Sequence, residues 1–231
     1  DIHTKPTTTP ARCWPITSMT RLVMPDPEKG VKPHLATAWT ISNGGKTYTF
    51  TLRRGVKFHD GSELQADDVV FSYERVKALN QGFAFLFSQW VSSVKAINPY
   101  TVQFNLSGVY APFLATLVRL PVVNKDLVLK NKKEGKFGEN GDYGQAFLSS
   151  NDAGSGAYKV VSHNPQELTV MEKFKDYFLG FSPKAPDIVR QRYSLESSTM
   201  RTLMVRKEHD ISSQWHPQEV FKALAANPGS S

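Results

Sequence analysis

Two short groups of histidine and acidic residues have the chemistry to bind a metal ion or to transfer protons. One lies within residues 59–63 (HDGSE) and the other within residues 209–216 (HDISSQWH). Neither group has the spacing of a recognised zinc motif. Adjacent His and Asp residues on an extended chain also point to opposite sides. We therefore interpret both groups as turn and surface residues, and we expect neither a metal ion nor a cofactor.

A serine between two glycines, Ser155 in Gly154-Ser155-Gly156, is the best candidate for a nucleophile. The segment is not a G-x-S-x-G nucleophile elbow, because Ala153 precedes it. A hydrolase remains an alternative function, and it predicts turnover that is lost in Ser155→Ala. The other interpretation is that small residues let the backbone approach a ligand or a hinge, unless the turn simply needs glycine. We expect no enzymatic activity and regard Ser155 as a ligand-binding candidate.

Aromatic side chains supply two further candidates for binding a small molecule. Phe83, Phe85, Phe87 and Trp90 stand within eight residues, and such clusters occur in cores as well as in pockets. Of these four residues, Phe85 is the ligand-binding candidate. Trp215 follows a short strand and precedes a proline, where a loop can present an indole ring to a ligand.

The pattern of the chain predicts short strands and helices in an α+β arrangement. Residues 46–52 alternate between Tyr, Phe or Leu and Thr, which indicates a half-buried strand. The glycines at 44 and 45 favour a hairpin with the segment around Trp39. Further helices are expected from Ala66, within 111–120, within 143–148, from Ser197 or Ser198 to Arg206, and after Pro217. Further strands are expected at 101–106, 158–161, 168–171 and 188–193.

The overall composition excludes some classes of protein. The net charge is +7, but Lys and Arg are scattered, and the densest basic run, 130–136, also contains Glu134. This distribution argues against a nucleic-acid partner. No run of eighteen apolar residues occurs that would predict a membrane span. The chain starts at Asp1 without a charged-then-apolar leader, so we expect that any signal peptide was removed or never present. Cys13 is the single cysteine, so no internal disulfide is possible.

Five segments, in one order, resemble the signature of the family-5 extracellular solute-binding proteins of ABC importers. They are residues 35–39 (LATAW), 48–61 (YTFTLRRGVKFHDG), 67–72 (DDVVFS), 152–158 (DAGSGAY) and 170–177 (VMEKFKDY). The first three form a long and specific cluster. The last two are weaker individually, but their order along the chain supports the same assignment.

The resemblance implies a mixed α/β fold like the first lobe of a type II periplasmic binding protein. Residues 35–156 would be an added subdomain, and residues 1–34 and 157–231 would be part of the first-lobe core. Family members are considerably longer, so the second lobe is expected to lie outside this sequence. The resemblance places Met19 on a segment that borders the cleft and Phe85 in a region that approaches it. Met19, Phe85, Ser155 and Trp215 are thus the ligand-binding candidates.

The implied function is capture of a small solute outside the cytoplasm, in the periplasm or at the cell surface. Two lobes would close on the solute, and an ABC permease in the membrane would recognise the closed form. Peptides, metal chelates and oligosaccharides are the solute classes that the resemblance allows. A ligand-sensing module of a regulator is an alternative, because the same fold serves in sensors.

Overall fold

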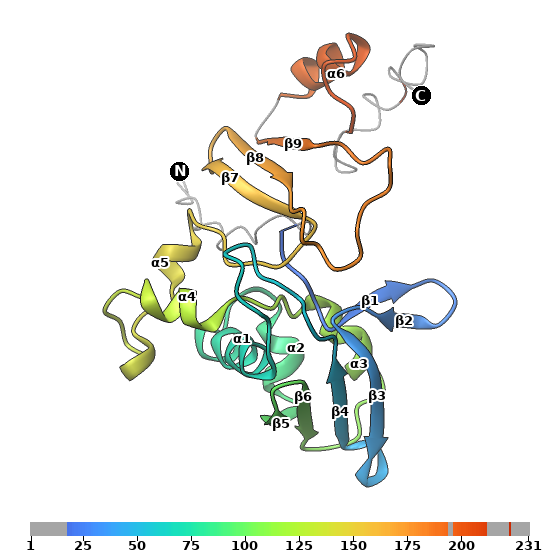
Figure 1. Ribbon diagram of the computed structural model, residues 1–231, viewed down its shortest axis with the longest axis vertical. Coiled ribbons are helices and arrows are strands. Elements are labelled where there is room, and N and C mark those ends of the chain that lie inside the picture. The colour runs from blue at the N-terminus through green and yellow to red at the C-terminus, as the bar shows by residue number, and fades with distance from the viewer. Residues whose placement is uncertain (1–17, 194–195, 212–221, 223–231) are drawn as a thin grey trace, which may run out of the picture. The chain divides into compact units, whose positions relative to one another are not determined.

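The computed structural model describes residues 18–193, 196–211 and 222 of the chain, which divides into two compact units (Figure 1). The first unit comprises the residues up to 163 together with residues 170–189. The second comprises residues 164–169 and the chain from residue 190 onward. Within the described residues, no helix combines the length and apolar character that crossing a membrane requires.

A four-stranded antiparallel sheet is the largest sheet of the first unit. Its strands are β3 (Ala36–Ser42), β4 (Thr47–Leu52), β5 (Val91–Asn98) and β6 (Thr101–Leu106), in the order β3-β4-β6-β5. The β3–β4 hairpin is closed by Asn43, Gly44 and Gly45, whose φ angles of 51°, 60° and 86° are all positive. The predicted hairpin and the strands at 46–52 and 101–106 are confirmed.

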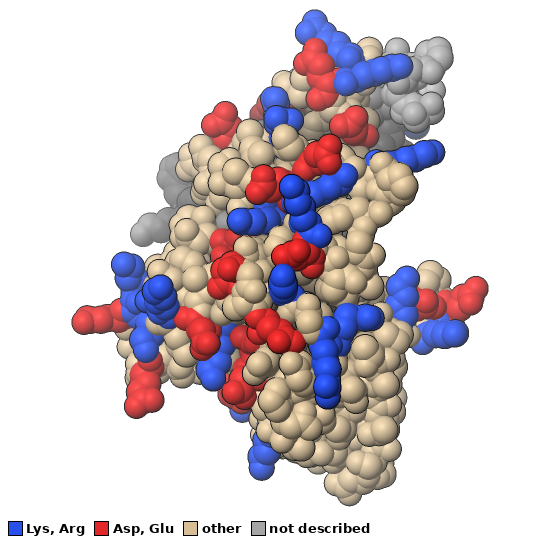
Figure 2. Space-filling model, viewed as in Figure 1, with Lys and Arg blue, Asp and Glu red and all other residues tan. Residues whose placement is uncertain are grey.

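The two faces of this sheet differ in chemistry. The face that packs into the core carries these buried side chains of β4 and β6: Tyr48, Phe50, Leu52, Val102, Phe104 and Leu106. The other face carries hydroxyl and amide side chains that bond one another; for example, Gln103 Nε2 donates to Thr49 Oγ1 at 3.2 Å. This alternation is why the end of the first unit around β3 and β4 shows almost no charge in Figure 2.

Helix α1 (Ala66–Leu79) covers the buried face of the sheet at β5 and β6. It begins where predicted. Its start is fixed by Asp68, because one carboxylate oxygen accepts from the Gln65 N–H at 2.8 Å and the other from the Lys125 N–H at 2.9 Å. Asp68 is buried, and burial raises its pKa to about 6 although both N–H donors lower it. The helix ends at Asn80, which adopts a left-handed φ of 48°.

The buried Asp68 should make stability depend on pH. Its pKa in the folded protein, about 6, is above the usual value of 3.8 for an aspartate, so this carboxyl group stabilises the fold most below pH 3.8. That contribution is lost as the pH rises through 6. We expect the free energy of unfolding of the wild type, relative to Asp68→Asn, to fall by about 2 kcal/mol between pH 4 and pH 7.5. Urea unfolding at both pH values measures the difference; an equal difference at the two pH values would contradict this assignment.

Short elements fill the remainder of the first unit. A hairpin of β1 (Val23–Asp26) and β2 (Gly30–Pro33), which was not predicted, precedes the sheet. The short helices are α2 (Phe85–Ser88), α3 (Phe113–Thr116), α4 (Lys125–Lys130) and α5 (Gln145–Leu148). Helices α3 and α5 lie within segments that were predicted to be helical, whereas α4 was not predicted.

In the later part of the chain the described residues form a three-stranded sheet and the helix α6. The strands β7 (Tyr158–Asn164), β8 (Leu168–Lys173) and β9 (Ile188–Arg192) stand in that order and confirm the predicted strands. Helix α6 (Ser197–Val205) is preceded by Glu196, so the expectation that Ser197 or Ser198 caps it is wrong. The helix expected after Pro217 lies outside the described residues. The mixed α/β class is confirmed.

Candidate functional site

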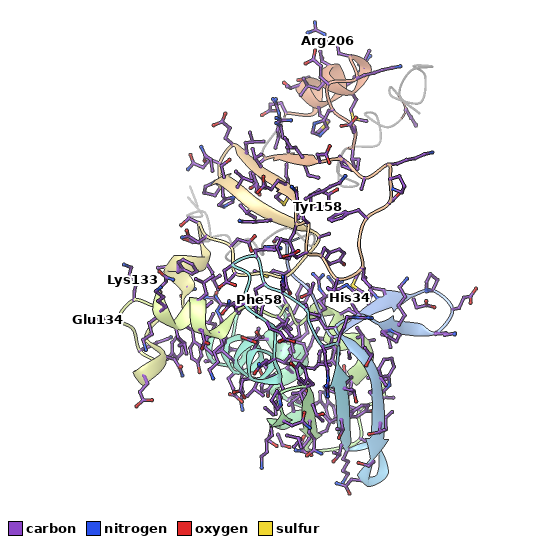
Figure 3. The ribbon with its side chains drawn as sticks, in the orientation of Figure 1. His34, Phe58, Lys133, Glu134, Tyr158 and Arg206 are labelled. Carbon is purple, nitrogen blue, oxygen red and sulfur yellow. The ribbon has the colours of Figure 1, made fainter. Side chains whose placement is uncertain are left out.

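Four segments of the first unit meet at one place, which we call the junction. They are residues 18–20, 57–62, 122–124 and 152–156. Phe58, which belongs to the second of these segments, is labelled in Figure 3. Four backbone hydrogen bonds, each 2.9 Å long, join the segments: Val122 N to Thr20 O, Gly156 N to Ser18 O, His59 N to Gly154 O, and Asn124 N to Ala153 O.

A buried pair of ionisable side chains, His59 and Asp152, links two of the four segments. His59 Nδ1 lies 2.7 Å from Asp152 Oδ2, and both side chains are less than a tenth exposed. The other ring nitrogen, Nε2, lies 2.9 Å from the Gly156 carbonyl oxygen. The edge of the ring is packed against Phe174, with the ring centres 4.8 Å apart. The expectation that His59 is a surface residue is therefore wrong.

The Asp152 carboxylate also orders its own loop. Oδ1 accepts from the Gly154 N–H at 2.8 Å, and Oδ2 accepts from the Val160 N–H at 2.9 Å in addition to its contact with His59. A carboxylate that receives several donors is fixed in position, so the backbone around Gly154 is fixed with it. Asp152 thus fixes its own loop as well as the contact with His59.

Asn124 makes a second set of polar contacts at the junction. Its amide nitrogen donates to Asp60 Oδ2 at 2.8 Å and to Ser62 Oγ at 2.9 Å. Its amide oxygen caps α4 by accepting from the Leu127 N–H at 2.9 Å. Asn124 is buried while Asp60 is exposed, so the network passes from the interior of the unit to its surface.

Two of the four sequence candidates lie together at the junction. Met19 is 9% exposed and packs in a small apolar cluster with Phe71, Val123 and Tyr143. Ser155 is fully buried, and its hydroxyl group is hydrogen-bonded to the hydroxyl of Thr20, the residue after Met19. The structure therefore places Ser155 against the Thr20 side chain, in the segment that carries Met19.

Phe85, the third candidate, is not at the junction. Phe85 is 65% exposed at the start of α2, with its ring centre 6.5 Å from that of Phe83. Phe83 is covered by the Arg119 guanidinium group, whose carbon lies 4.7 Å from the ring centre. Phe87 is fully buried, and Trp90 stacks on Tyr110, so the aromatic cluster is divided between core and surface. Trp215 lies outside the described residues.

The polar residues of the junction are bonded to one another in a way that does not resemble a nucleophile with its base. The Ser155 hydroxyl contacts Thr20, and the His59 ring nitrogens contact Asp152 and the Gly156 carbonyl. Across the residues that the structure describes, no three His, Cys, Asp or Glu side chains are grouped to hold a metal ion. What the arrangement does is fix the backbone of residues 18–20 and 152–156 in register.

Sequence reasoning missed the contact between His59 and Asp152 and the role of Asn124. His59 stands in the motif at 48–61, and Asp152 stands in the motif at 152–158. The two motifs therefore offered a signal, because one contains a histidine and the other contains a carboxylate that can pair with it. Nothing in the local pattern indicates that the two loops meet.

Comparisons with known proteins agree with this architecture. Residues 30–229 match the model of the bacterial extracellular solute-binding proteins, family 5 (middle). A di/tripeptide-binding protein of Pseudomonas aeruginosa is 36% identical over 180 residues, which are 69% of this chain and 32% of the relative. The chain therefore spans about a third of that relative's length.

Two solved structures extend the comparison. The periplasmic binding protein DppA of Helicobacter pylori, in complex with the peptide STSA, is 29% identical with a TM-score of 0.71, covering 92% of this chain and 43% of that one. NikZ of Campylobacter jejuni, in complex with Ni(L-His), is 25% identical with a TM-score of 0.72, covering 84% of this chain and 37% of that one. Because the family model matches residues 30–229 and these relatives agree with it, the chain belongs to the family-5 bacterial extracellular solute-binding proteins.

Proposed function

We propose that this chain is the first-lobe part of a protein that captures a short peptide outside the cytoplasm and delivers it to an ABC permease in the membrane. The observation that carries the proposal is the family match over residues 30–229, in register with the motifs at 35–61. The peptide class is favoured over metal chelates and oligosaccharides for two reasons. The relative with 36% identity is named a di/tripeptide-binding protein, and the DppA structure contains the peptide STSA. In this function no bond of the solute is made or broken.

The domain division that the sequence suggested is part of this proposal. Residues 35–156 would form the added subdomain, and residues 1–34 and 157–231 would belong to the first-lobe core. The four-stranded sheet and α1 support the division, since they are contained entirely within residues 35–156. The junction would then be the place where the subdomain is attached to the core segment at residues 18–20.

The candidate residues take different roles in this proposal. Phe85, exposed on α2, and Trp215 would offer aromatic surface to the solute. Met19 would border the cleft from its place in the core. Ser155, whose side chain is buried, would act through its backbone and through its bond to Thr20. The second lobe would supply the remaining contacts and close on the solute by a hinge motion.

Calorimetric titration of the full-length protein with di-, tri- and tetrapeptides tests the proposal, with small-angle scattering to follow closure. We expect saturable binding of peptides together with a smaller radius of gyration in the bound state. Binding of Ni(L-His) or an oligosaccharide instead of any peptide would refute the peptide class. Binding without any change in the radius would refute closure.

Phe85 offers a direct test of a proposed solute contact. Because its side chain is 65% exposed, Phe85→Ala should change the free energy of unfolding by less than about 1 kcal/mol. Losing one aromatic contact should raise the peptide Kd of the full-length protein by about tenfold.

Phe87→Leu is the matched control. Phe87 is fully buried two residues further along the same helix, so this substitution should cost about 1 kcal/mol of stability and leave the Kd unchanged. An unchanged Kd in Phe85→Ala would remove Phe85 from the site. Urea unfolding and calorimetry give the two readouts.

A further inference from the structure

The ring of His59 has an oxygen atom that accepts hydrogen bonds at each of its two nitrogens. Nδ1 lies 2.7 Å from Asp152 Oδ2, and Nε2 lies 2.9 Å from the Gly156 carbonyl oxygen. A carbonyl oxygen has no proton to donate. The two Asp152 oxygens already accept from the Gly154 and Val160 N–H groups, which suits an ionised carboxylate. Both partners of the ring are therefore acceptors.

Only the protonated ring satisfies two acceptors. A neutral imidazole has one N–H group and one lone pair, so in this position its lone pair would face an oxygen at hydrogen-bond distance. The imidazolium ion has two N–H groups and donates to both oxygens. The geometry alone thus selects the charged form.

The charges around His59 favour the same form. Asp152 faces the ring directly, and Asp60, the next residue in the loop, is a second carboxylate nearby in the sequence. Phe174 packs its ring against the imidazole and brings no charge. The cation on this loop, Lys57, is paired with Asp176 at 3.2 Å. Thr20, Asn124 and Ser155, from the other segments, are neutral.

His34 of the same unit, which is labelled in Figure 3, has different hydrogen-bond partners. Its Nδ1 lies 3.0 Å from the Arg21 carbonyl oxygen, but its Nε2 lies 3.3 Å from the Tyr177 hydroxyl, which can either donate or accept. A neutral ring satisfies both contacts. Burial, together with the charges of Arg21 and Arg53, lowers the pKa of His34. One chain therefore contains two buried histidines whose surroundings select different charge states.

We propose that His59 is held as an imidazolium ion and that this charge makes it a positioning residue for the solute-facing segments. The ion binds residues 152–156 to the His59 loop, and residues 154–156 in turn hold the backbone of Ser18 and the hydroxyl of Thr20. Loss of the proton leaves one contact repulsive, so the loop and the Met19 segment shift together. The effect on solute affinity rests on the proposed function, whereas the charge state does not.

Nuclear magnetic resonance of the full-length protein with ¹⁵N-labelled histidine tests the charge state. Variants His59→Gln and His34→Gln assign the two sets of signals. At pH 7 we expect a proton on both ring nitrogens of His59 and on only one of His34. A single protonated nitrogen on His59 would overturn the proposal, even if both variants failed to fold, because the ring signals of the wild type can also be assigned through the bonds that connect each ring to its own backbone.

Comparison of the wild type with His59→Gln, which cannot carry the charge, tests the positioning role. In the variant the backbone amide signals of Met19 and Ser155 should shift. Its Kd for the peptide STSA should be about tenfold higher than that of the wild type. His34→Gln, the control, should retain the wild-type Kd.

The outcomes distinguish the two proposals. Amide signals of Met19 and Ser155 that are unchanged in His59→Gln would refute the positioning role. A protein that binds no peptide but shows a doubly protonated His59, with amide signals that shift in His59→Gln, would refute the peptide class and leave this inference standing.

Discussion

Gly154→Ala is expected to destabilise the protein by about 3 kcal/mol or more, because there is no room for a methyl group at this position. A Cβ atom on Gly154 would overlap the Ser18 carbonyl oxygen, lie 2.8 Å from the Ser18 carbonyl carbon and lie 3.2 Å from Asp152 Oδ1. The first two obstacles are backbone atoms, which cannot rotate away as a flexible side chain can. Ser18 is also fixed, since its carbonyl oxygen accepts from the Gly156 N–H.

The matched control for this substitution is Gly108→Ala. There the added Cβ would meet Trp90 at 3.5 Å, which is ordinary van der Waals contact. We expect Gly108→Ala to change stability by less than about 1 kcal/mol. Urea unfolding of both variants provides the comparison. Equal stability of the two would show that residues 18 and 154 are not in contact and that the junction is wrongly described.

The second large effect is expected from Asp152→Ala, at about 3–5 kcal/mol. This substitution removes the buried partner of His59 and leaves the N–H groups of Gly154 and Val160 without their acceptor. Breaking a buried ion pair from one side costs more than the pair contributes, because the remaining charge stays desolvated. The loss should appear as a lower urea midpoint and as lost protection of the Gly154 and Val160 amides from hydrogen exchange.

The Lys57–Asp176 ion pair is the control for Asp152. Its charged atoms lie 3.2 Å apart, but the two side chains are 48% and 56% exposed. Water screens such a pair, so Asp176→Ala should cost less than about 1 kcal/mol. If Asp152→Ala were as mild as Asp176→Ala, the buried pair would not be what holds the loop at 152–156.

Local patterns predicted the elements whose residues alternate or repeat without interruption. The alternation over residues 46–52 and 101–106, and the apolar spacing after Ala66, led to β4, β6 and α1. Strand β5 was missed because bulges between Val91 and Ser93 and between Ala96 and Asn98 interrupt its alternation. The β1–β2 hairpin was missed because each strand has four residues and contains a proline.

Of the four candidate residues proposed from the sequence, the structure brings two together at the junction, and none of their contacts was predicted. Met19 and Ser155 were selected, and the structure joins them through Thr20. His59 was interpreted as a surface residue because its neighbours, glycine and aspartate, are typical of an exposed turn. Its true environment depends on Asp152, which is 93 positions away, and no local pattern encodes a contact over that distance. Only the fold brings the two together.

The central claim is that the intact protein holds a small solute and does not transform it. Mass spectrometry of the full-length protein, purified without denaturation and then incubated with the peptides that it retains, tests this claim most directly. We predict that short peptides are released on unfolding and that they are recovered intact after long incubation with the protein. Cleavage of these peptides, abolished by Ser155→Ala, would contradict the claim and favour a hydrolase.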